Sequence, residues 1–247
     1  MQTNSFKEAR ISLYIVAILL SVSLIFYFFA SMFTTMGISA LRRAQKADSD
    51  AGSDLPIIII DAGHGGEDPG ACANGLEEKS LNLEIALAVK EYLSEFGYSV
   101  VLTRNADVML YNRGEEDKKK YYDVRNREAV AESYGNAVFV SIHFNKFPIE
   151  SCAGLQTFYS KNNDKSILLA ESIQSNALLL QKDNKRTIKC GNESIYLMKS
   201  LDMPAVLIEC GFLSNPNEAA LLKTEEYKKA LTLSIYCGIA EFLEDKK

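Results

Sequence analysis

The stretch that decides the fold reads Ile57-Ile58-Ile59-Ile60-Asp61-Ala62-Gly63-His64-Gly65-Gly66. Its run of β-branched apolar residues predicts a strand that is buried on both faces, as in an α/β sheet. The glycines around His64 allow the backbone to turn tightly and to approach a ligand closely. A histidine at the carboxyl end of a buried strand lies where open α/β sheets place their ligand sites. We therefore expect His64 to be a zinc ligand whose partners come from elsewhere in the chain.

The composition limits the class of protein. The chain has 247 residues and a formal net charge of −5, which suits one domain with an appendage. The acidic balance argues against a nucleic-acid binder, which would carry a basic patch or stripe. The chain has five cysteines but no CxxC pair, which argues against a cysteine-based zinc site. We expect the cysteines to be small buried hydrophobes, although one disulfide stays open if the domain is outside the cell.

The N-terminal part predicts a membrane anchor. After a short tail over residues 1–10, residues 11–41 contain no charged residue. This apolar run exceeds the ~20 residues that a membrane span requires and the 7–15 of a cleaved signal peptide. We favour an uncleaved signal-anchor over cleavage and secretion. A polar linker over 42–55 then leads to a globular domain over 56–247.

Strands alternate with helices along the globular part. We expect strands at 57–60, 98–102, 137–142, 154–159, 192–197 and 205–208, and helices at 77–96, 124–133, 166–180 and 216–242. This order predicts a single α/β domain with a mostly parallel, twisted sheet of about six strands and helices on both faces. Three strand ends carry His64, His143 and Glu209. In a parallel sheet these ends share one edge, so the three side chains should converge.

The chain has only two histidines, and both follow short apolar strands. We expect both to be ligands of a His₂Glu zinc site, a known catalytic set that leaves a position for water. The alternative is that they are ordinary hydrogen-bonded histidines at strand ends. The candidates for the carboxylate ligand are Glu67, Asp68, Glu77, Glu78 and Glu84. We favour a carboxylate at the helix start, Glu77 or Glu78, which could instead complement the helix dipole. Spacing alone does not choose between the two.

Two further acidic residues follow buried strands. Glu209 comes directly after Ala205-Val206-Leu207-Ile208, where a carboxylate is costly unless it is paired or poised for chemistry. We expect it to be the base that takes a proton from zinc-activated water; the alternative is a salt bridge to an arginine. Asp61 either accepts an N–H from a ligating imidazole or caps the following turn.

Four motifs together resemble the zinc-dependent N-acetylmuramoyl-L-alanine amidases of the Amidase_3 family. They are Asp61-Ala62-Gly63-His64-Gly65-Gly66, Glu78-Lys79, Ser141-Ile142-His143-Phe144-Asn145 and Glu209-Cys210-Gly211-Phe212-Leu213-Ser214-Asn215. The similarity spans about residues 56–243 and implies that His64, Glu78 and His143 bind zinc and that Glu209 is the catalytic glutamate. It thereby selects Glu78 over Glu77. Phe144 stands where the family often has a small residue, which would narrow the cleft.

The resemblance implies hydrolysis of the amide between N-acetylmuramic acid and L-alanine in peptidoglycan. The small size and anchor are similar to a germination-specific, spore-cortex member, which implies an extracytoplasmic, membrane-anchored enzyme that removes stem peptides before lactam formation. An activating envelope protein is a further expected partner. The alternatives are a zinc peptidase that cuts within the stem peptide and a non-catalytic wall-binding or activator protein. Arg104 and Arg127 stay open between a site role and an ordinary surface or structural role.

Overall fold

A computed structural model describes residues 55–112 and 114–244. The expected signal-anchor over 11–41 and most of the linker lie outside these residues. No helix among the described residues is long and apolar enough to span a membrane.

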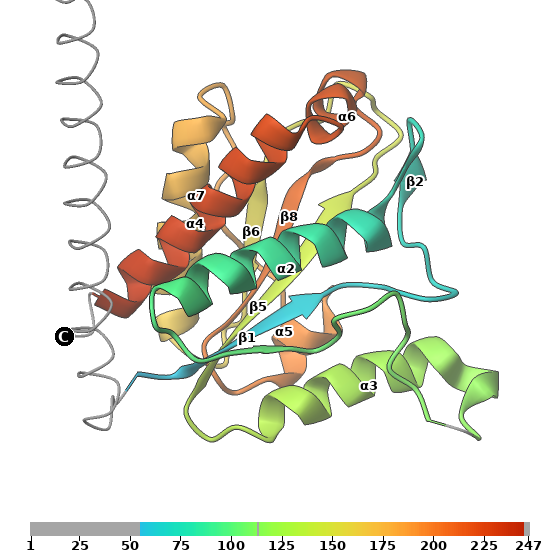
Figure 1. Ribbon diagram of the computed structural model, residues 1–247, viewed down its shortest axis with the longest axis vertical. Helices are drawn as coiled ribbons and strands as arrows, with labels where there is room; N and C mark the ends of the chain where they lie inside the picture. Colours follow the sequence, from blue (N-terminus) through green and yellow to red (C-terminus); the bar gives the residue numbers. More distant parts are fainter. Residues whose placement is uncertain (1–54, 113, 245–247) are drawn as a thin grey trace, which may run out of the picture. The chain divides into compact units, whose positions relative to one another are not determined.

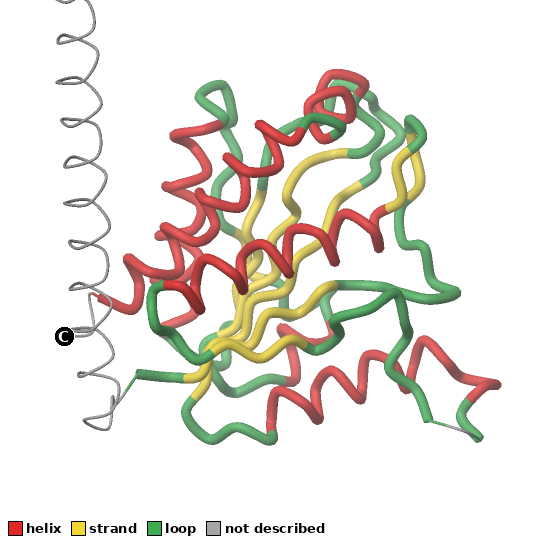
Figure 2. Tube along the Cα trace, viewed as in Figure 1, coloured by secondary structure: helices red, strands yellow, loops and turns green. Residues whose placement is uncertain are grey.

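The described part is an α/β domain (Figures 1 and 2). The strands are β1 (Ile57–Ala62), β2 (Cys72–Ala73), β3 (Leu76–Glu77), β4 (Val100–Leu102), β5 (Ala137–Asn145), β6 (Gln156–Tyr159), β7 (Lys189–Cys190) and β8 (Ala205–Phe212). The helices are α2 (Glu78–Glu95), the 3₁₀ helix η1 (Glu116–Lys118), α3 (Lys119–Glu132), α4 (Lys165–Leu180), α5 (Tyr196–Ser200), α6 (Pro216–Leu222) and α7 (Glu225–Glu244).

The main sheet has six strands in the order β4-β1-β5-β8-β6-β7. The strands β4, β1, β5 and β8 run parallel to one another, and β6 runs antiparallel to β8. The expectation of a mostly parallel six-stranded sheet is therefore confirmed. Because the four parallel strands share a direction, their carboxyl ends lie at one edge, which carries the site described below.

Each face of the sheet packs against its own helices, because alternate residues of a strand point to opposite faces. One core contains Ile58, Ile60, Val140 and Ile208 with residues of α2, α4 and α7. The other contains Ile59, Phe139 and Leu207 with residues of α3 and α5. Figure 1 shows α3 on the side of the sheet opposite to α2, α4 and α7. The complete burial of Ile58, Ile59 and Ile60 agrees with the unbroken apolar run.

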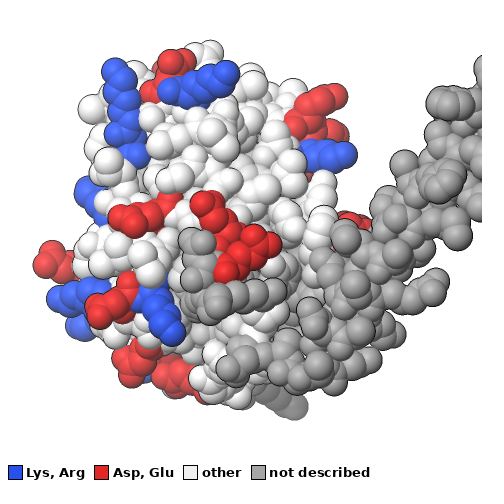
Figure 3. All heavy atoms as spheres, turned by 90° about the vertical axis from the view of Figure 1, so that its left-hand side faces the viewer, with Lys and Arg blue, Asp and Glu red and all other residues white. Residues whose placement is uncertain are grey.

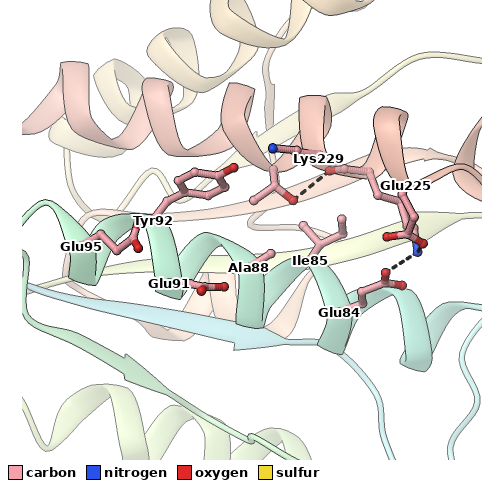
Figure 4. Close-up of a pocket in the computed structure, with 10 residues that line it drawn as sticks. Glu84, Ile85, Ala88, Glu91, Tyr92, Glu95, Glu225 and Lys229 are labelled. Atoms are coloured by element: carbon pink, nitrogen blue, oxygen red, sulfur yellow. Dashed lines mark hydrogen bonds and ion pairs between the residues drawn. The ribbon is translucent and has the colours of Figure 1, made fainter. Parts of the chain in front are cut away.

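Helices α2 and α7 lie side by side, with a groove between them that residues of both helices line (Figure 4). Lys228 crosses this groove and forms ion pairs with Glu84 and Glu225. Figure 3 views the molecule from the left side of Figure 1; acidic groups gather near the centre of this face and basic groups lie mostly around them.

The expected fifth strand at 192–197 is wrong. Residues 192–194 form a turn in which the Gly191 carbonyl accepts from the Ser194 and Ile195 amides at 3.2 and 2.9 Å, and helix α5 follows. A short apolar run does not distinguish a strand from a buried helix turn, and here packing against the sheet selects the helix. The edge strand is instead β7, which pairs with β6.

Several element boundaries also differ from the expected ones. Helix α3 begins at Lys119 rather than at residue 124, because its first turn is polar and adds nothing to the apolar pattern. Strands β5 and β8 extend beyond their apolar runs, so that His143 and Glu209 lie within the strands. The loop expected at 63–75 ends in a small hairpin formed by β2 and β3.

Candidate metal centre and catalytic carboxylate

His64, Glu78 and His143 meet at the carboxyl edge of the sheet. His64 follows β1, Glu78 is the first residue of α2, and His143 lies in β5. Glu78 Oε1 is 3.2 Å from His64 Nε2 and 2.8 Å from His143 Nδ1. Ligand atoms of all three residues lie within 4.8 Å of one another. This separation allows one cation to contact all three, because zinc binds imidazole nitrogen and carboxylate oxygen at about 2.0–2.2 Å.

The backbone around these residues leaves room only for glycine. A Cβ on Gly63 would lie 2.2 Å from the His143 ring, and one on Gly70 would lie 2.5 Å from Glu78 Oε2. His64 itself has a φ of 59°, a left-handed conformation that is uncommon for a residue with a side chain. The glycines of the motif therefore allow the main chain to approach the three side chains closely.

A carboxylate holds the second ring nitrogen of His64, but it is not Asp61. Asp68 Oδ2 lies 2.8 Å from His64 Nδ1, and Lys120 Nζ donates to Asp68 Oδ1 at 2.7 Å. With its proton on Nδ1, His64 would present an unprotonated Nε2 toward Glu78. This is the arrangement that orients metal-binding histidines in general. Asp68, one of the candidate carboxylate ligands, thus contacts His64 from the other side of the ring.

Of the two roles that the sequence left open for Asp61, the bond to a ligating imidazole is contradicted, because its carboxylate binds other partners. It is fully buried, and it accepts hydrogen bonds from Arg127 Nη1 at 2.7 Å, Ser141 Oγ at 2.5 Å and Thr103 Oγ1 at 2.6 Å. Burial alone would raise the pKa of Asp61, but Arg127 and the two hydroxyl groups hold it below its usual value. The carboxylate is an anchor for α3 beneath the site.

Arg104 and Arg127 are both buried, each with a side chain about 3% exposed, which excludes an ordinary surface role. Arg127 Nη2 donates to the carbonyl oxygen of His64 at 2.7 Å, and its Nε forms an ion pair with Asp123 at 2.9 Å. Arg104 donates to the carbonyl oxygens of Ala62 and Gly63 at 2.8 and 2.9 Å. The two arginines thus fix consecutive peptides around His64.

Glu209 lies in β8 directly opposite His143 of β5, and one of its carboxylate oxygens has no hydrogen-bond partner. Its Oε2 is buried and makes no hydrogen bond within the described part of the chain. No arginine among the described residues forms an ion pair with it, which argues against the salt-bridge alternative. Burial raises the pKa of Glu209 to about 7. A carboxyl group with this pKa can take and return a proton near neutral pH.

The charges at the centre favour cation binding. Burial would raise the pKa of Glu78, yet its hydrogen bonds with His143 and His64 hold this pKa well below the usual range, so the side chain is a carboxylate. Burial would lower the pKa of His64, but its bonds with Glu78 and Asp68 raise it to about 8.

The remaining carboxylate candidates lie elsewhere. Glu67 binds Lys119 at 2.6 Å, Glu84 pairs with Lys228, and the Glu77 residue is exposed. Phe144 belongs to the buried core and is 2% exposed, so the expectation that it narrows the cleft is wrong.

The five cysteines are free, and only Cys210 is buried. Cys72 and Cys190 are exposed and Cys152 and Cys237 are partly buried, so the expectation that the cysteines are buried hydrophobes is confirmed only for Cys210. Asn82 was not among the expected site residues. Its spacing of four residues from Glu78 indicates that the two side chains share one face of the helix. In the structure Asn82 Nδ2 lies 3.4 Å from Glu78 Oε1.

The family model of the N-acetylmuramoyl-L-alanine amidases matches residues 58–241. The chain belongs to this family. It is therefore an enzyme, an N-acetylmuramoyl-L-alanine amidase that acts on peptidoglycan. The resemblance inferred from the four motifs is confirmed.

Similar proteins and solved structures agree with the assignment to this amidase family. The chain is 36% identical over 194 residues to the germination-specific N-acetylmuramoyl-L-alanine amidase of Bacillus subtilis, a match that covers 77% of this chain and 81% of the relative. The structure of the CwlD amidase from Clostridioides difficile, in complex with the GerS lipoprotein, is similar with a TM-score of 0.73 and 39% identity over 77% of this chain and 99% of that one. The amidase AmiC2 of Nostoc punctiforme is similar with a TM-score of 0.66 and 30% identity, over 78% and 99% of the two chains.

Proposed function

We propose that His64, Glu78 and His143 bind one zinc ion and that Glu209 is the general base in hydrolysis of the amide between N-acetylmuramic acid and L-alanine. The observation that carries this proposal is the arrangement of three ligand atoms within 4.8 Å of one another beside a buried, unpartnered carboxylate oxygen. The family assignment supplies the substrate bond.

The donor set fits zinc. Two imidazoles and one carboxylate are a known catalytic ligand set that leaves a position open, and the family is typically zinc-dependent. Because Gly63 and Gly70 have no Cβ atom, the space beside the His143 ring and the Glu78 carboxylate stays clear. The Asp68 contact on Nδ1 of His64 leaves Nε2 for the ion.

When bound, zinc supplies a Lewis acid that polarises the scissile carbonyl and makes water nucleophilic near neutral pH. Glu209 accepts the proton of the attacking water and then delivers it to the departing amine nitrogen of L-alanine. The pKa of about 7 that burial gives Glu209 suits both transfers. Asp68 and Arg127 hold His64 in position from its ring and its carbonyl oxygen.

We further propose that the enzyme removes stem peptides from peptidoglycan during spore-cortex maturation, as a membrane-anchored, extracytoplasmic protein. The germination-specific relative and the sporulation-specific amidase of Bacillus subtilis, 31% identical over 193 residues, support the spore setting. The apolar run at 11–41 supports the anchor. The complex of CwlD with a lipoprotein supports an activating envelope protein as a partner of this chain too.

The experiment that tests the site combines metal analysis with product analysis. The purified full chain should contain about one zinc per molecule, and His64→Ala should abolish this. Mass spectrometry of digested peptidoglycan should show intact free stem peptides and glycan without stems. Shortened stems would indicate a zinc peptidase, and the absence of both metal and release would indicate a wall-binding protein.

A further inference from the structure

The carbonyl oxygen of Gly63, in the peptide directly before His64, accepts hydrogen bonds from two buried side chains. Arg104 Nη2 donates to it at 2.9 Å and Asn82 Nδ2 at 3.0 Å. Both donors also bind the first turn of α2. Arg104 Nη2 donates to the Lys79 carbonyl at 2.8 Å, and Asn82 Nδ2 lies 3.4 Å from Glu78 Oε1. Each side chain therefore joins the His64 loop to the helix that carries Glu78.

Arg104 is held in this place by the backbone alone. Its Nε donates to the Ala62 carbonyl at 2.8 Å and its Nη1 to the Ala106 carbonyl at 3.0 Å. No carboxylate among the described residues forms an ion pair with it. Burying a guanidinium is costly unless its donors are satisfied, and here four backbone carbonyls accept hydrogen bonds from it. The planar fork of arginine can bond to several fixed carbonyls at once.

Arg127 differs from Arg104 in what it connects. It binds the carbonyls of Ala62 and His64, but its other partners are Asp61 and Asp123, on β1 and α3. None of these contacts reaches α2. Arg127 therefore anchors the His64 loop to the opposite face of the sheet, whereas Arg104 and Asn82 relate this loop to Glu78.

We propose that Arg104 and Asn82 are positioning residues that set the separation of His64 and Glu78 and thereby preorganise the metal site. The inference rests on the proposed zinc-binding role of those two residues. Groups behind metal ligands affect metal binding by fixing where the donor atoms lie before the ion arrives. Loss of either side chain allows the His64 loop and helix α2 to move apart. Zinc must then bring His64 and Glu78 together as it binds.

The test measures zinc dissociation constants of the full chain by competition with a chromophoric chelator. Arg104→Lys keeps the charge but lacks the fork, and Asn82→Ala removes the amide. Each should weaken zinc binding about 10–100-fold. The matched control is Leu93→Ala, which removes a buried side chain from the far end of the same helix; it should lower the melting temperature and leave zinc binding unchanged.

The visible spectrum of the Co²⁺-loaded protein provides a readout that a stability defect does not change. At saturating Co²⁺ the Arg104→Lys and Asn82→Ala variants should show altered absorption bands, because the ligand atoms of His64 and Glu78 are no longer held in their native positions. The spectrum of Leu93→Ala should match that of the native protein. Zinc affinities within twofold of native, with a native Co²⁺ spectrum, would overturn the inference. If Arg104→Lys does not fold, Asn82→Ala decides alone. A native chain without zinc affinity rejects the proposed function itself, whereas equal affinities of native and variant chains reject only the positioning role.

Discussion

His143 and Glu209 are direct partners across the parallel pair of β5 and β8. The register then shifts between His143 and Asn145, so the ladder is regular up to these two residues and irregular after them. Backbone pairing, rather than a flexible side chain or loop, therefore places the catalytic candidate next to a proposed ligand. The same register brings Glu209 opposite Gln156 of β6, so its strand is fixed from both sides.

Replacement of Glu209 by glutamine should separate metal binding from turnover. Glu209→Gln keeps the shape of the side chain but cannot accept the proton of water. We expect unchanged zinc content and a 10²–10⁴-fold loss of amide hydrolysis, the usual contribution of a general base. Metal analysis and mass spectrometry of released stem peptides check both outcomes. Substantial residual hydrolysis would remove Glu209 from the mechanism.

Glu78 and Glu77 provide a matched pair for the ligand assignment. Glu78 is buried between the two imidazoles, whereas its neighbour Glu77 is exposed. Glu78→Ala should lose bound zinc and, with it, hydrolysis. Glu77→Ala should retain the zinc content and activity of the native enzyme. An unchanged zinc stoichiometry in Glu78→Ala would reject that residue as a ligand.

The stability of the metal-free protein should depend on the ionisation of Glu209. Because burial raises its pKa from 4.5 to about 7, the folded state binds a proton that the unfolded chain has released over this range. Stability should therefore fall as the pH rises from about 4.5 to 7, by on the order of 3 kcal/mol at about 1.4 kcal/mol per pKa unit.

Glu209→Gln removes this ionisable group and provides the comparison. With a chelator present, urea unfolding should show the variant to be more stable than the native protein at pH 8 and about equally stable at pH 4. A stability difference that is the same at both pH values would contradict the buried, neutral state of Glu209.

The carboxylate of Asp68 should matter for zinc affinity because it orients the His64 ring. Asp68→Ala leaves Nδ1 of His64 without its 2.8 Å partner, and we expect zinc binding to weaken about 10–100-fold. Glu67→Ala is the control, because Glu67 also pairs with a lysine of α3 but is 69% exposed and does not touch the ring. Equal zinc affinities of the two variants, measured by chelator competition, would contradict this role.

Arg127 should contribute mainly to stability. Arg127→Gln would leave Asp61 and Asp123 buried without their cation, and breaking a buried ion pair in this way costs about 3–5 kcal/mol. Denaturant unfolding of the metal-free protein measures this loss. The Lys119–Glu67 ion pair, whose Glu67 side chain is 69% exposed, is the control, and Lys119→Gln should change stability by less than about 1 kcal/mol.

Local pattern was sufficient for the elements that are regular and buried. The apolar run Ile57–Ile60 predicted β1, and the acidic start before an apolar face predicted α2. Pattern failed at 192–197, where a short apolar run forms a turn and α5, because the packing of Leu197 and Met198 against the sheet decides between a strand and a helix turn. The hairpin of β2 and β3 was missed because each of its strands has two residues, too few to show a period.

The sequence by itself determined which residue types meet at the carboxyl edge of the sheet, because parallel strands bring their carboxyl ends together whatever the loops do. It thus indicated His64, His143 and Glu209, and the family motifs added Glu78. Only the tertiary structure decided how these groups are held. Whether Asp61 or Asp68 contacts the His64 ring depends on Arg127 and Lys120, which reach them from α3. Arg127 and Lys120 lie more than 50 positions away from these carboxylates along the chain. A local sequence pattern cannot predict which side chains come into contact over such a separation.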